Sequence, residues 1–196
     1  MEYANRSRVW SREELSRIMS SDREQRMPRG PVISALKPNP GETLADVGAG
    51  LGWLSLPLAQ QVGSDGKVWA IEPSRDAVEA LCQIARAEGL SQLAPAQAFA
   101  EESPVPDSSV DGVVWHTVAL HMGDRIRAMA ETYRMLKRGG RWVVVDWKLI
   151  ETVAGPPLER RVSAETIAAE ARAAGFDLLH AFEPGPVTWG LVWTKR

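Results

Sequence analysis

A run of three glycines follows a predicted buried strand and precedes a predicted helix. The run reads Asp46-Val47-Gly48-Ala49-Gly50-Leu51-Gly52. Glycine lets the backbone turn and approach a ligand without a Cβ clash, and the helix N-terminus behind it offers unpaired N–H groups to a carboxylate or phosphate. The spacing is G-x-G-x-G, and Trp53 stands where a dinucleotide pyrophosphate site needs its third glycine. The run therefore indicates a ligand loop and disfavours a nicotinamide dinucleotide.

A carboxylate, Glu72, ends the next predicted strand. It follows Asp46 by one helix and one strand, and the carboxyl ends of neighbouring parallel strands meet at one edge of a sheet. A carboxylate in that place accepts hydrogen bonds from two ribose hydroxyls. A solvated glutamate at the end of a strand is the alternative, but the glycine loop upstream favours the ribose.

Three more polar side chains follow the fourth and fifth predicted strands. His116 and His121 lie just beyond the fourth strand, and Asp146 ends the fifth. An unperturbed histidine has a pKa of about 6.5, so either one could act as a base near neutral pH. Packing of His121 at the start of the next helix, and capping of the sheet end by Asp146, are the structural alternatives. His180 lies in a C-terminal strand and is expected to be structural.

The elements that position these residues alternate between strand and helix. Strands are predicted over 43–47, 67–71, 92–98, 110–115, 141–146, 176–182 and 188–194, and helices over 53–62, 74–88, 123–137 and 163–174. Such alternation predicts an α/β fold with a doubly wound, mostly parallel seven-stranded sheet and helices on both faces. The last two strands flank the turn-like segment 183–186 and predict an antiparallel β-hairpin.

The N-terminal part of the chain is predicted to be a helical cap. Ser11 and Glu14 have the spacing of a capping box, and 27–31 breaks the helix that follows. The length favours one domain over 1–196, with a cap segment over 1–40 and an α/β core over 41–196. We expect the cap to cover the ligand, because little else in a short chain could exclude water.

Composition excludes several classes. The net charge is −2, so no global positive field favours nucleic acid. Cys82 is the one cysteine, which rules out a disulfide within the chain and disfavours a cysteine-based metal site, so no metal is expected. The N-terminus is polar and no apolar run approaches the ~18 residues of a membrane span. The sequence thus predicts a cytoplasmic protein.

Four segments together resemble the class I S-adenosylmethionine (SAM)-dependent methyltransferases, which have a Rossmann-like fold. The resemblance covers about Leu36 to the C-terminus and is to the type 11 branch, which also holds ubiquinone/menaquinone C-methyltransferases and arsenite methyltransferases. The segments are Leu44–Gly52, Trp69–Ser74, Ala100–Asp111 and Arg134–Arg141. Arsenite chemistry is disfavoured, since As(III) needs several thiolates and Cys82 is alone.

The resemblance implies a role for each motif. Asp46 would orient the methionine amino group, the backbone around Gly48 and Gly50 would hold the methionyl part, and Glu72 would grip the ribose. The candidate cofactor-binding set is Asp46, Gly48, Ala49, Gly50, Gly52, Trp53, Glu72, Pro73, Ala100, Glu101 and Trp115. The family usually has an acidic residue just before the Ala100 position, where this chain has Phe99. Phe99 would then stack on the adenine, or Glu101 would supply the missing acceptor.

The resemblance further implies methyl transfer to a small-molecule O, N or C nucleophile. Displacement at a sulfonium releases a neutral thioether, so the enzyme mainly aligns the reactants, and a base is needed only if the nucleophile must lose a proton. His116, His121 and Asp146 are the candidates for that role. Two other classes stay open. A NAD(P)-dependent oxidoreductase is disfavoured by Trp53 and by the lack of a Tyr-x-x-x-Lys pair. A non-catalytic SAM sensor or partner-binding protein has the same fold. A homodimer is also left open.

Overall fold

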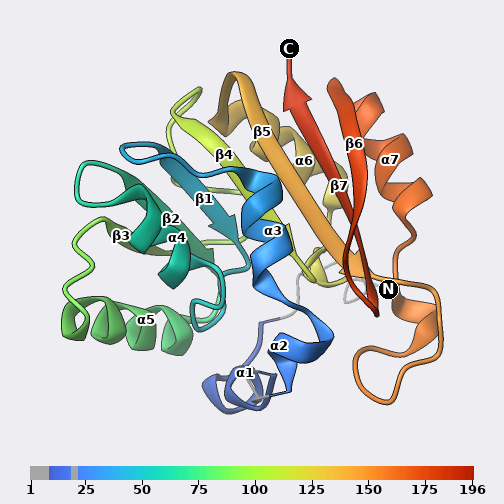
Figure 1. The fold of residues 1–196 in the computed structure, drawn as a ribbon, viewed down its shortest axis with the longest axis horizontal. Coiled ribbons are helices and arrows are strands. Elements are labelled where there is room, and N and C mark those ends of the chain that lie inside the picture. The colour runs from blue at the N-terminus through green and yellow to red at the C-terminus, as the bar shows by residue number, and fades with distance from the viewer. Residues whose placement is uncertain (1–8, 19–21) are drawn as a thin grey trace.

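A single seven-stranded sheet runs through the molecule in the order β3-β2-β1-β4-β5-β7-β6 (Figure 1). The computed structural model describes residues 9–18 and 22–196. The strands are β1 (Thr43–Val47), β2 (Lys67–Glu72), β3 (Leu93–Gln97), β4 (Val110–His116), β5 (Leu136–Trp147), β6 (Phe176–Gly185) and β7 (Thr188–Lys195). Strands β1 to β5 pair in parallel, whereas β7 runs antiparallel to both β5 and β6. The predicted sheet and its C-terminal antiparallel hairpin are confirmed.

Helices cover both faces of this sheet. Helices α3 (Arg29–Leu36), α4 (Ser55–Val62) and α5 (Arg75–Ala87) pack on one face, and α6 (Arg125–Met135) and α7 (Ala164–Ala173) pack on the other. Side chains alternate between the faces along each strand, so Leu44 joins the first layer while Ala45 joins the second. The two short helices α1 (Arg12–Ile18) and α2 (Arg23–Arg26) lie beyond the carboxyl ends of β1 and β4 (Figure 1).

Side-chain caps begin several helices at the residues where the sequence predicts them. In the capping box of α1, the Ser11 N–H donates to Glu14 and the Glu14 N–H donates to the Ser11 hydroxyl, at 2.9 and 3.2 Å. Ser74 accepts from the Ala77 N–H to cap α5, and Ser163 caps α7 in the same way. Each cap satisfies an N–H that the helix itself cannot pair.

Several features differ from the prediction, and β5 begins at Leu136, ahead of the strand predicted over 141–146. α6 ends at Met135, because the carbonyls of Arg134 and Met135 accept hydrogen bonds from the loop N–H groups of Ser108 and Ser109. β6 continues through the segment predicted as a turn and ends at Gly185, with an irregular register after Phe182. α3 packs on the sheet beside α4 and α5, so only α1 and α2 remain as the cap. None of the helices in the described residues is long and apolar enough to cross a membrane.

Candidate functional site

A cavity of about 520 Å³ opens at the carboxyl ends of β1, β2 and β4. The strand order reverses between β1 and β4, and ligands of doubly wound sheets bind at such a point. The floor comes from strand ends and the glycine loop, and the cap comes from α1 and α2 through Leu15, Arg23 and Met27. A third wall comes from the loop that follows β5 and includes Trp147, Gly155 and Arg160.

Glu72 is held rigidly in the floor of this cavity. Its side chain is 4% exposed. One carboxylate oxygen accepts from the Gly50 N–H at 2.9 Å and the other from the Ser74 N–H at 3.0 Å. Burial raises the pKa of Glu72, and the two backbone hydrogen bonds oppose that shift. An ionised carboxylate has about four acceptor positions, so each oxygen keeps capacity for a ligand hydroxyl.

The three glycines of the loop have different tasks. Gly48 has φ +76°, and a Cβ there would lie 2.3 Å from a methyl of Val118. Gly50 has φ +55° and donates its N–H to Glu72. A Cβ on Gly52 would lie 2.7 Å from Leu81 of α5, so this glycine permits close helix packing and does not line the cavity. The first two glycines shape the ligand wall.

A buried polar cluster joins β1, β4 and the cap. Asp46 accepts from the Ser55 hydroxyl at 2.6 Å, and burial raises its pKa to about 6. Arg23 reaches into the cavity and lies 3.5 Å from Nδ1 of His116. Burial lowers the pKa of Arg23 to about 10, so the guanidinium stays charged at neutral pH, and its charge also acts on Asp46. Since arginine can only donate, Nδ1 of His116 is the acceptor.

This arrangement makes His116 a poor base. Burial, followed by the charge of Arg23, lowers the pKa of His116 to about 3. The ring is therefore neutral at physiological pH, and its Nδ1 lone pair faces a cation. His121 also lines the cavity and meets Trp10 edge to face, with ring centroids 5.1 Å apart. His121 is thus the second histidine of the cavity wall.

The loop after β3 forms the side of the cavity predicted to hold adenine. Ala98, Phe99 and Ala100 line it, and Phe99 is 41% exposed. Glu101 is not in the cavity wall, since its Oε1 accepts from the N–H groups of Gly123 and Asp124 ahead of α6. The structure therefore does not bring Glu101 to the place of the missing adenine acceptor, and Phe99 faces the cavity in its stead.

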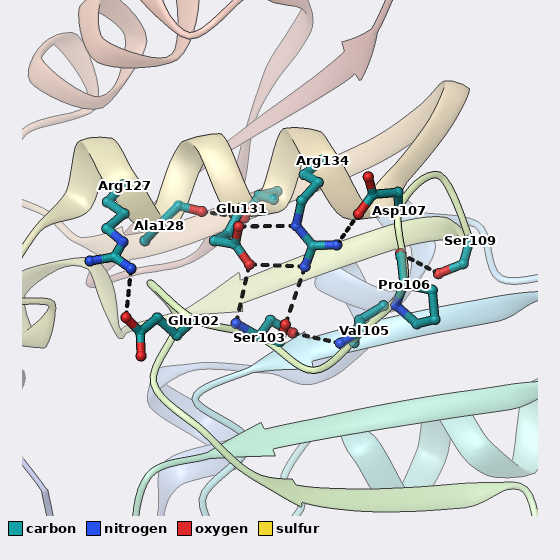
Figure 2. Close-up of polar contacts among 11 residues, drawn as sticks. Glu102, Ser103, Val105, Pro106, Asp107, Ser109, Arg127, Ala128, Glu131 and Arg134 are labelled. Atoms are coloured by element: carbon teal, nitrogen blue, oxygen red, sulfur yellow. Dashed lines mark hydrogen bonds and ion pairs between the residues drawn. The ribbon is translucent and has the colours of Figure 1, made fainter.

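Arg134 of α6 anchors the continuation of that loop. Its guanidinium donates to Glu131, to Asp107 and to the carbonyl of Ser103 (Figure 2). Glu131 in turn accepts from the Ser103 N–H, and Arg127 pairs with Glu102. The network ties the segment after Phe99 to α6, so this side of the cavity is held by the fold.

The remaining predicted residues divide into two groups. Those that line the cavity are Asp46, Gly48, Ala49, Gly50, Trp53, Glu72, Pro73, Ala100, His116 and His121. Gly52, Glu101, Trp115 and Asp146 lie outside its lining. Trp115 is fully buried against Trp142, with ring centroids 4.8 Å apart. Asp146 is fully buried and accepts from the N–H groups of Ala119 and Trp147, so it fixes the loop after β4. Burial raises the pKa of Asp146 to about 7.

Sequence reasoning missed two arginines that shape the site. Arg23 reaches His116, and its charge acts on Asp46, only because α2 packs at the carboxyl ends of the strands, and no motif marks it. Arg161 stacks over Trp147 at 5.0 Å and donates to the carbonyls of Lys148, Ile150 and Pro156 and to the Thr152 hydroxyl. The Pro-rich segment 155–157 was the signal for a rigid loop, but not for the residue that organises it.

The fold and the site define a nucleoside-binding α/β protein with a glycine loop and a ribose-type carboxylate. Residues 44–140 match a family described as methyltransferase domain. The chain is 29% identical over 133 residues to the demethylmenaquinone methyltransferase of Symbiobacterium thermophilum, covering 67% of this chain and 53% of that protein. It is 30% identical over 127 residues to a ubiquinone/menaquinone biosynthesis C-methyltransferase of Cupriavidus metallidurans, covering 61% of this chain and 51% of that protein.

The fold is shared with a SAM-dependent methyltransferase from Aquifex aeolicus. The two structures superpose with a TM-score of 0.89 at 22% identity, over 95% of this chain and 100% of the other. The chain spans about half the length of the two curated relatives. The family match and these likenesses agree with the motifs of the glycine loop and the acidic strand end. Residues 44–140 thus belong to the methyltransferase domain family, and the chain has the fold of the class I SAM-dependent methyltransferases.

Proposed function

We propose that this protein transfers a methyl group from SAM to a small-molecule acceptor with an oxygen, nitrogen or carbon nucleophile. The observation that carries the proposal is the buried Glu72 carboxylate in the cavity floor, held by Gly50 and Ser74. A carboxylate fixed in this way beside a glycine loop suits the two hydroxyls of a ribose. The names of the curated relatives support a small acceptor.

The residues of the cavity fit SAM along its length. Glu72 would hold the ribose and Phe99 would lie along the adenine. Asp46 would attract the methionine ammonium, and Arg23 offers its guanidinium to the methionine carboxylate. Gly48 has no Cβ, so the glycine loop can lie directly against Val118, another residue of the cavity wall. The carboxylate of Asp46 and the guanidinium of Arg23 would therefore pair with the ammonium and the carboxylate of the methionine part.

Bound SAM supplies a methyl group on a sulfonium, and the departing thioether is neutral. The protein has to bind the acceptor, align it and exclude water. α1 and α2 cover the cavity for the last of these tasks. His116 is not suited to remove a proton, since burial and the charge of Arg23 disfavour its protonated form and its Nδ1 faces Arg23. We propose that catalysis rests on alignment, with His121 as the candidate to contact the acceptor.

The alternative is a non-catalytic SAM sensor or partner-binding protein on the same fold. A homodimer and a cytoplasmic location stay predictions from the sequence. We do not propose a nucleic-acid or membrane partner, because the net charge is −2 and the described helices include no membrane span.

Calorimetry with SAM, S-adenosylhomocysteine (SAH) and NADH tests the proposal. We expect both adenosyl ligands to bind and NADH not to bind. Failure of both adenosyl ligands to bind the folded protein would overturn the proposed function. Tight binding without turnover over a broad panel of small acceptors would favour the sensor instead.

A further inference from the structure

One part of the cavity has side chains that the proposed SAM site does not use. These are Arg26 and Met27 of the cap, Met122, Trp147, and the loop residues Pro156, Pro157 and Arg160. Except for the two arginines, they are apolar. This part of the wall is therefore suited to an apolar body with a polar group.

The charges on the lining are distributed unevenly. Its two carboxylates, Asp46 and Glu72, both belong to the proposed cofactor site. Arg26 lies 3.0 Å from Asp22, whose carboxylate partly neutralises the charge of Arg26. The guanidinium of Arg160 makes no ion pair or hydrogen bond with any residue that the structure describes. Among the described residues, the acceptor part of the wall therefore has cations and no carboxylate, which disfavours an ammonium group and favours an anion.

The wall that carries Arg160 is rigid. The next residue, Arg161, ties the loop together through the carbonyls of Lys148, Ile150 and Pro156 and lies over Trp147. All of its hydrogen-bond partners are neutral oxygens, so its charge adds to that of Arg160. A Cβ on Gly155 would lie 2.4 Å from the Trp147 ring, so backbone and indole are in close contact. A wall fixed in this way can hold a bound molecule in one orientation.

The chemistry of methyl transfer also favours an anionic acceptor. A neutral hydroxyl or protonated amine must lose a proton to become a nucleophile. In the described part of the chain no carboxylate lines this part of the cavity, and Nδ1 of His116 is engaged by Arg23, which leaves His121 as the cavity histidine that could take up a proton. An acceptor that enters already ionised needs no base, and nearby guanidinium groups stabilise it in that form.

We infer that the acceptor is a largely apolar molecule with an anionic group, a carboxylate or an ionised acidic hydroxyl, which Arg160 binds in the cavity that Trp147 also lines. The inference rests on the proposed function, because it takes the rest of the cavity to hold SAM. It narrows the acceptor to a chemical class and assigns Arg160 as the residue that selects for it.

Binding of three matched probes tests the inference. The probes are 2-naphthoate, its uncharged methyl ester, and 2-naphthylmethylamine, which is a cation at neutral pH. Calorimetry is done on the full chain, with and without saturating SAH. We expect 2-naphthoate to bind tightest. Arg160→Gln should weaken 2-naphthoate by about 10-fold, the lower end of what a charged hydrogen bond contributes, with the ester and SAH unchanged. Arg138→Gln, an exposed arginine at the other end of β5, is the control and should change none of them.

Each outcome separates the two proposals. Equal or better binding of the amine, no binding of 2-naphthoate in either state, or an unchanged affinity in Arg160→Gln would each overturn the inference. If SAH binds in those cases, the proposed function stands. If SAH does not bind but 2-naphthoate binds through Arg160, the anion site is supported and the cofactor assignment fails.

Discussion

Replacement of Glu72 by alanine tests the cofactor site most directly. The carboxylate is 4% exposed, and its two oxygens hold the N–H groups of Gly50 and Ser74 at 2.9 and 3.0 Å. The same oxygens have the capacity to accept from two ribose hydroxyls. Hydrogen bonds to a charged group contribute about 1.5–3 kcal/mol, so we expect Glu72→Ala to weaken SAH binding by about 2–3 kcal/mol in total. That loss corresponds to roughly 30- to 150-fold in Kd.

The assay is calorimetric titration of SAH into both proteins, with thermal melting to confirm that the variant folds. Glu79→Ala is the matched control, because Glu79 lies on the exposed surface of α5, 58% exposed and paired with Arg75. Its SAH affinity should equal that of the wild type. Glu72→Gln keeps the side-chain size but turns one acceptor into a donor, so its loss of SAH affinity should be smaller than that of Glu72→Ala and larger than that of Glu79→Ala. A folded Glu72→Ala protein that binds SAH as tightly as the wild type would refute the placement of the ribose.

Two further predictions concern Asp46 and Gly48. Burial raises the pKa of Asp46 to about 6, so SAH affinity should fall as the pH drops from 7 to 5 and the carboxylate loses its charge. Asp46→Asn should flatten this pH profile. If the affinity of the wild type does not change over that range, the proposed role of Asp46 is wrong. The pKa of Asp46 in the folded protein lies above its ordinary value of 3.8. Asp46 therefore favours folding below about pH 4, and this contribution is lost as the pH rises through 6. Urea unfolding of the wild type and of Asp46→Asn across this pH range measures the contribution. Gly48 and Gly41 both have positive φ, but only Gly48 would place a Cβ against Val118, at 2.3 Å. Gly41→Ala should therefore cost about 1 kcal/mol of stability from backbone strain. Gly48→Ala should cost about 1–3 kcal/mol more and should also weaken SAH binding. Equal losses of stability for the two variants in urea unfolding would show that the contact with Val118 has no cost.

Local patterns in the sequence were enough to predict the sheet, its order of elements and the ligand loop. Short apolar runs between turn residues mark the strands, and Ser11, Ser74 and Ser163 mark helix starts through hydrogen bonds that form within one turn. Glu72 could be placed at the end of its strand because only one helix and one strand separate it from the glycine loop. These features depend on neighbours in sequence, so they can be read without the fold.

The tertiary structure decided which way side chains face and which distant groups meet. Trp115 was expected at the cofactor, but the strand alternates its side chains and turns Trp115 toward Trp142 in the core, while His116 faces the cavity. Asp146 likewise lies inside the fold, where it accepts from Ala119 and Trp147.

Contacts between distant segments complete the site. The helix that carries Arg23 folds across the sheet and brings it to His116, 93 positions away. Arg161 finds its carbonyl partners only when the loop after β5 closes on Trp147. The sequence by itself determined that the chain has a glycine loop and a ribose-type carboxylate on a doubly wound sheet. Only the packed structure decided which charges enclose the cavity, because charge and burial at a site depend on segments that the chain brings together after it folds.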